Sequence, residues 1–116
     1  MKTIRTCLAI AVLSAPTLAA ADNAEAGLAL VKDHGGVNGL ALACAEARVA
    51  ARARELMLAH ATKTARFGAA YEESTNDAFN AQTRSGKPCD DATALTARLN
   101  LLALRLADVL PIAPKQ

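Results

Sequence analysis

Side chains that commonly bind metals are scarce in this chain, which has two histidines and three cysteines among 116 residues. His34 and His60 stand far apart, and no Cys-x-x-Cys, His-x-x-x-His or His-Glu-x-x-His pattern occurs, so no recognisable set of metal ligands is present. Met57 and His60 could in principle ligate a haem iron, but residues three apart share one side of a helix and cannot bind opposite faces of one iron. A Cys-x-x-Cys-His attachment site is also missing. We therefore expect neither a metal nor a haem.

Acid–base and nucleophilic catalysis find little support either. The neighbouring carboxylates Glu72-Glu73 and Asp90-Asp91 point in different directions on a helix, whereas acid–base catalysis needs two groups that converge on a substrate. His34-Gly35-Gly36 looks like the oxyanion-hole loop of lipases, but the chain has no Gly-x-Ser-x-Gly nucleophile turn. One tyrosine, two phenylalanines and no tryptophan leave little material for an apolar pocket. We expect a protein that is not an enzyme and binds no cofactor.

The first residues predict export from the cell. Lys2 and Arg5 precede the apolar run Cys7–Leu13, and the small residues Ala19-Ala20-Ala21 follow, which are the three parts of a secretory signal. The apolar run is too short to span a bilayer, so a permanent membrane anchor is not expected. With cleavage after Ala21, residues 1–21 are the signal and residues 22–116 form a single helical domain. The predicted location is a bacterial periplasm or the extracellular medium.

Export also bears on the cysteines and on the charge. Cys7 leaves with the signal, so Cys44 and Cys89 remain in a compartment that favours a disulfide. Closing a loop of that length stabilises a small domain by about 4 kcal/mol on the chain-entropy model. Loss of Lys2 and Arg5 lowers the 13 basic residues to the number of acidic ones, 11. Because nucleic-acid binding depends on an excess of basic residues, we expect no such partner.

The periodicity of apolar residues predicts an all-α fold, a small disulfide-stapled bundle of three main helices plus a short N-terminal helix. In the expected central helix, Leu40–Arg66 carries apolar stripes on two opposite faces, which implies cover from two sides. His34-Gly35-Gly36 is read as the end of the first helix, and Asn38 as the N-cap of the next. The expected helices are 23–33, 38–66, 69–85 and 91–110.

The disulfide decides where the chain turns after the second helix. A turn near Gly68 gives an ascent of roughly 33 Å and a return of roughly 26 Å, whereas a turn at residues 74–76 gives roughly 45 Å and 15 Å. Cysteine Cα atoms must approach within about 7 Å, so the turn near Gly68 is preferred. Gly86 then ends the third helix, and Asp90 or Asp91 caps the last. The buried seam expected on the last helix comprises Leu95, Leu99, Leu102, Leu106, Val109 and Leu110.

Two leucines of the last helix, Leu101 and Leu104, do not fit this seam. The simpler explanation is that the first helix covers them through Leu28 and Val31. The alternative is an exposed apolar spot with charged residues beside it, the usual make-up of a partner surface. On that hypothesis the candidate partner surface consists of Leu101, Leu104, Arg98 and Arg105.

These features indicate a small exported protein that acts by binding another protein, as an inhibitor or an immunity protein does. In outline, with an export signal, two widely spaced cysteines and helices throughout, the chain is similar to periplasmic immunity proteins and to acid-activated periplasmic chaperones. Such a chaperone is one alternative function, and a structural accessory of a cell-envelope assembly is another. A homo-oligomer is compatible with all three functions.

Overall fold

Four helices make up nearly all of the chain that the computed structural model describes, residues 16–60 and 64–111, with side chains from residue 24 onward. They are α1 (Pro16–Ala43), α2 (Ala47–His60), α3 (Ala65–Ser85) and α4 (Ala92–Val109). No strand occurs in these two ranges, which confirms the all-α prediction. Residues 1–15, which hold most of the predicted signal, lie outside the described residues, so export stays a prediction.

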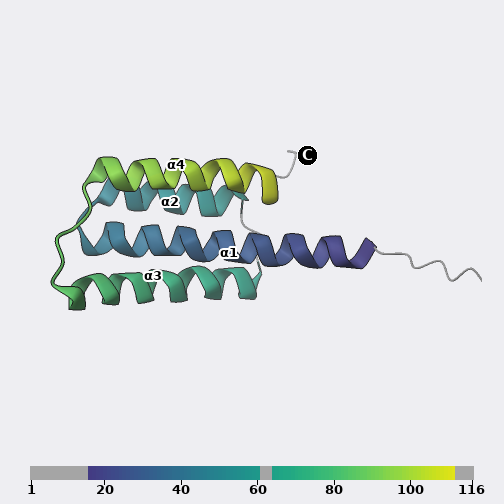
Figure 1. Cartoon of the computed structure of the whole chain (residues 1–116), viewed down its shortest axis with the longest axis horizontal. Coiled ribbons are helices and arrows are strands. Elements are labelled where there is room, and N and C mark those ends of the chain that lie inside the picture. Colours follow the sequence, from purple (N-terminus) through teal and green to yellow (C-terminus); the bar gives the residue numbers. More distant parts are fainter. Residues whose placement is uncertain (1–15, 61–63, 112–116) are drawn as a thin grey trace, which may run out of the picture.

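The central element of the bundle is α1. Figure 1 shows it between α3 on one side and the pair α2 and α4 on the other, and α1 packs against all three. α3 runs in the same direction as α1, whereas α2 and α4 run in the opposite direction, and the N-terminal turns of α1 project beyond the other helices. The expectation that a helix spanning 38–66 organises the fold is therefore wrong. The first helix is the organising one, and it is long rather than short.

The predicted stop at His34-Gly35-Gly36 does not occur, because these residues lie inside α1. His34 and Gly35 are buried, and so are Val31, Val37 and Ala41 on the turns around them. Burial on several sides holds this segment helical in spite of the low helix propensity of glycine. Asn38 is likewise not an N-cap: it lies within α1, where its side chain donates a hydrogen bond to the Thr75 hydroxyl of α3 at 3.3 Å.

The chain instead turns at Cys44-Ala45-Glu46, within the first third of the helix expected over 38–66. Ala45 has a φ of 57°, in the left-handed region. The Glu46 amide donates to the Ala41 carbonyl at 2.8 Å and the Ala45 amide to the Leu42 carbonyl at 3.4 Å, the two bonds of a Schellman motif. Glycine usually occupies the left-handed position of that motif. Alanine at Ala45 therefore gives no stop signal in the sequence.

The later helix boundaries are closer to the prediction. α3 begins at Ala65, four residues before the expected start, where the Thr64 side chain accepts a hydrogen bond from the Phe67 amide. The helix continues through residues 74–76 and ends at Gly86, which has a φ of 65°. The Asp91 carboxylate caps α4 by accepting from the Ala94 amide at 2.7 Å. The prediction that the chain does not turn at residues 74–76 is confirmed, whereas the turn expected near Gly68 does not occur there, because Gly68 lies inside α3.

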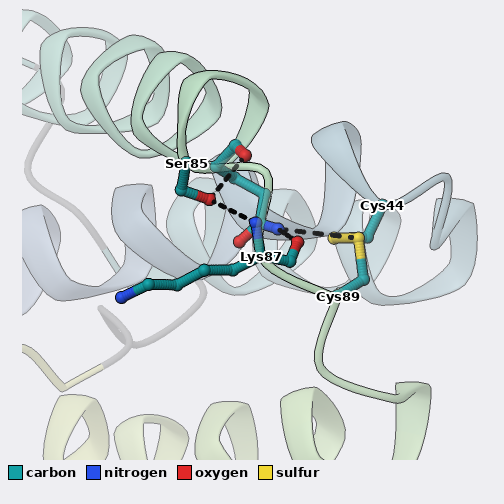
Figure 2. Close-up of a disulfide and its surroundings, with 5 residues drawn as sticks. Cys44, Ser85, Lys87 and Cys89 are labelled. Carbon is teal, nitrogen blue, oxygen red and sulfur yellow. Dashed lines mark hydrogen bonds between the residues drawn. A yellow bond between two sulfur atoms is a disulfide. The ribbon is translucent and has the colours of Figure 1, made fainter.

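The disulfide closes the end of the bundle at which α1 ends and α4 begins. Cys44 and Cys89 have their Cα atoms 5.8 Å apart and their sulfur atoms 2.16 Å apart. In Figure 2 the chain leaves α3 at Ser85 and passes Lys87 before it reaches this bond. Gln82 donates to the Lys87 carbonyl at 3.0 Å, and the Lys87 amide donates to the Ser85 hydroxyl at 3.1 Å. The predicted cysteine pairing is confirmed.

Two groups of buried side chains meet on α1. One joins α1, α2 and α4, and the other joins α1, α2 and α3. α2 contributes a single buried face, because the second apolar stripe expected on it, which includes Leu58, is exposed. The buried leucines predicted on α4, Leu95, Leu99, Leu102 and Leu106, all lie in the first group.

Candidate functional site

The leucines of α4 that do not belong to its buried seam are the most exposed large apolar side chains described. Leu101 is 63% exposed and Leu104 is 68% exposed. Val31, which was expected to cover them, is fully buried among Met57, Phe67 and Ala70, and Leu28 packs against the same group. The explanation that the first helix covers the two leucines is therefore wrong.

These leucines belong to a second seam on the outer face of α4. Exposed residues recur there at intervals of three and four, a spacing that places them on one side of a helix. We call this set the outer strip. It consists of Ala94, Ala97, Leu101, Leu104 and Asp108.

The two edges of the outer strip differ in chemistry. Arg98 and Arg105 lie along one edge, both exposed, and no salt bridge within the described residues involves either of them. The other edge carries uncharged residues, Thr93 and Asn100, beside a shallow hollow lined by Ala97. The strip is thus apolar at its centre and ends in the acidic Asp108, with two arginines along one side and uncharged residues along the other.

Beyond the arginines lies a groove between α1 and α4. Its apolar lining includes Leu30 of α1 and Leu102 and Val109 of α4. Asp33 and Arg105 line both hollows of this groove, and Leu101 of the outer strip also lines one of them. The groove is balanced in charge, since Asp33 and Asp108 accompany the two arginines. The sequence predicts contact between the first and last helices through Leu28 and Val31, but the α1 residues that line this groove include Leu30 and Asp33 instead.

The helix that carries the outer strip is fixed at both ends. Near its N-terminus the Cys44–Cys89 disulfide ties the preceding segment to α1, and the Asp91 cap follows. Beyond its C-terminus the His60 ring lies 2.8 Å from the Leu110 carbonyl through Nδ1, which must donate because a carbonyl only accepts. His60 is thus a hydrogen-bonded structural histidine. The strip lies on a rigid support.

The buried interior holds two polar side chains that make no hydrogen bond in the described residues, His34 and Tyr71. His34 is fully buried, and desolvation holds its pKa below 6.5. The Leu102 carbonyl and Asp33 partly offset that effect, although the carbonyl has no hydrogen-bonding geometry to either ring nitrogen. Burial also raises the pKa of the Tyr71 hydroxyl. The burial of His34 is not apparent from the sequence, because His34-Gly35-Gly36 has the composition of a turn.

Nothing else in the described residues assembles into a reactive site. No group of three or more His, Cys, Asp or Glu side chains there could hold a metal ion. Among these helices none is long and apolar enough to cross a membrane. Cys44 and Cys89 are bonded to each other, so neither serves there as a nucleophile.

No family model, curated protein or solved structure matches the chain.

Proposed function

We propose that the protein is an exported binding protein without catalytic activity and that the outer strip of α4 is its contact surface. The exposure of Leu101 and Leu104 carries this proposal. α4 already buries a complete seam of leucines against the bundle, so the fold does not require two further leucines in solvent. Exposed apolar residues with charged neighbours are typical of protein-binding surfaces.

The proposed location is the periplasm or the extracellular medium, with a mature chain that begins after Ala21. A disulfide and the lack of a membrane-spanning helix in the described residues are compatible with this location. Cleavage after Ala21 would remove the first residues of α1, at the end that projects beyond the other helices. The buried positions described on α1, from Gly27 onward, would remain.

The test is to immobilise the mature, oxidised protein and to pass periplasmic extract over it at neutral and acid pH. We expect one protein to be retained in a fixed ratio, and the double variant Leu101→Asp with Leu104→Asp to lose it. Leu58→Asp is the matched control, because Leu58 is 62% exposed on α2 and lies outside the strip. Both variants should keep the helical circular dichroism of the parent, since no buried side chain is changed.

Equal retention by all three proteins would refute a role for the strip. An empty column at both pH values would refute the binding function and favour a structural accessory of the envelope.

A second candidate function, an acid-activated chaperone, has one specific observation in its favour. His34 is completely buried on the central helix and has no hydrogen-bond partner among the described residues, so its protonation at low pH would oppose the packing of α1. Many unrelated proteins retained only at acid pH would support this function. A chaperone of this kind should also bind more of an apolar dye at acid pH than at neutral pH.

A further inference from the structure

Resting on the proposed binding function, we infer that the occupant of the outer strip is an amphipathic helix of another protein whose apolar stripe is flanked by Asp or Glu. Three features of α4 support this inference: the helical spacing of the strip, the placement of its charges, and the poor fit of a second copy of this chain.

The spacing of the strip matches a helical partner. Ala94, Ala97, Leu101, Leu104 and Asp108 alternate by three and four residues, the repeat by which two helices pack side by side. α4 has 18 residues, so such a contact can run along about five turns. Leucines at the centre and alanines toward the N-terminal end allow a partner helix to approach closely.

The charges determine the kind of helix. Arg98 and Arg105 are seven residues apart and therefore lie on the same edge of the strip, two turns from each other. Residues at such flanking positions face the flanking residues of the partner helix and decide which partner is accepted. Asp33 and Asp108 lie near these arginines, but neither forms a salt bridge with them among the described residues. An acidic residue of the partner can therefore pair with each arginine, whereas a basic residue there is repelled.

A second copy of this chain fits less well. In an antiparallel pair that places Leu101 of one copy against Leu104 of the other, Arg98 of each copy lies beside Arg105 of the other. In a parallel pair, Asp108 of one copy meets Asp108 of the other. Both arrangements bring like charges together along the contact, which disfavours self-association and favours an acid-flanked helix from a different protein.

The direct test uses synthetic helical peptides as probes. Two peptides with the length of α4 carry leucine and alanine at the seam positions, and they differ only in having Glu or Lys at the flanking positions. Fluorescence anisotropy with the oxidised protein should show the Glu peptide binding about tenfold more tightly at low salt, the effect of about 1.4 kcal/mol spread over two exposed charge contacts. Added salt should reduce this difference.

Variants then identify the residues responsible. Arg98→Glu with Arg105→Glu should reverse the preference toward the Lys peptide. Arg48→Glu is the matched control, because Arg48 is an exposed arginine on α2 rather than on α4, and it should leave the preference unchanged. Leu101→Asp with Leu104→Asp should abolish binding of both peptides.

Each alternative has its own outcome. If the two peptides bind equally and the leucine variant loses both, the strip binds proteins but the acidic preference is wrong. If neither peptide binds while the column retains a partner through the strip, the inferred occupant is wrong and the proposed function stands. A concentration-dependent dimer in sedimentation that the leucine variant abolishes would identify a second copy as the occupant. Binding to phosphatidylglycerol vesicles through Arg98 and Arg105, without peptide binding, would identify a membrane surface instead.

Discussion

The close contact between α1 and α3 predicts that two glycines of α1 respond in opposite ways to the same substitution. A Cβ atom added at Gly39 would lie 2.8 Å from the Ala78 Cβ and 2.9 Å from the Phe79 amide nitrogen, and it would also meet the Thr75 carbonyl. A Cβ atom added at Gly36, three residues earlier on the same helix, would have nothing within 4 Å. The two positions thus differ in surroundings and share their helical context.

The expected magnitudes follow from these surroundings. Alanine gains about 1 kcal/mol over glycine in a helix interior, so Gly36→Ala should stabilise the protein by roughly 0.5–1 kcal/mol. At Gly39 the obstacles are backbone atoms and a Cβ, which cannot rotate away, so α3 must shift as a whole. Overpacking of this kind costs about 1–3 kcal/mol or more, which exceeds the gain in propensity. The two variants should therefore differ by about 2–4 kcal/mol, with Gly39→Ala the less stable.

The assay is urea unfolding of the oxidised protein, followed by far-ultraviolet circular dichroism. At about 4–8 °C per kcal/mol for a domain of this size, thermal unfolding gives an independent measure. Equal stability of the two variants would show that α3 does not approach α1 at Gly39, and it would contradict the close packing of α3 against the central helix. Gly35→Ala should behave like Gly39→Ala, because its Cβ would lie 2.7 Å from the Tyr71 carbonyl oxygen.

Two further predictions concern other parts of α1. Ala45→Gly should stabilise the protein by about 1 kcal/mol in urea unfolding, because glycine adopts the left-handed conformation at this position without the cost that alanine bears; a loss of stability would contradict the Schellman assignment. Burial holds the pKa of His34 below 6.5, so below that pH the unfolded chain binds a proton that the folded ring does not. The free energy of unfolding therefore falls as the pH decreases, by at most about 1.4 kcal/mol per pH unit. His34→Leu should remove this contribution, so parallel stability curves for the two proteins between pH 7 and 5 would refute it.

The sequence predicts α4 best because local signals and tertiary packing agree there. Asp91 caps the helix, the regular leucines form its buried seam, and the residues left over from the seam are the exposed ones. The disulfide was also predictable, because removal of the predicted signal would leave only two cysteines, Cys44 and Cys89. A segment can be predicted from sequence when its local signals and its tertiary packing favour the same structure.

The sequence misleads at α1 because local signals and tertiary packing disagree. Gly35-Gly36 reads as a helix stop, but the missing side chain at Gly35 lets α3 come close, and the helix continues. Ala45 carries no stop signal, yet the chain turns there. Both errors place the end of the first helix too early in the chain. The sequence therefore predicts a short peripheral helix where the structure has a long central one. The groove between α1 and α4 could not be predicted, because it depends on which helix is central.

The stiffness of α4 bears on how the outer strip could bind. The disulfide and the Asp91 cap hold one end of the helix, and the hydrogen bond from His60 to the Leu110 carbonyl holds the other. Between these points Leu95, Leu99, Leu102 and Leu106 are almost completely buried, so the backbone beneath Leu101 and Leu104 has little freedom to lose. Because a partner need not order this helix, a larger share of the contact energy would appear as affinity. Reduction of the disulfide should therefore weaken binding at the strip even though neither cysteine belongs to it.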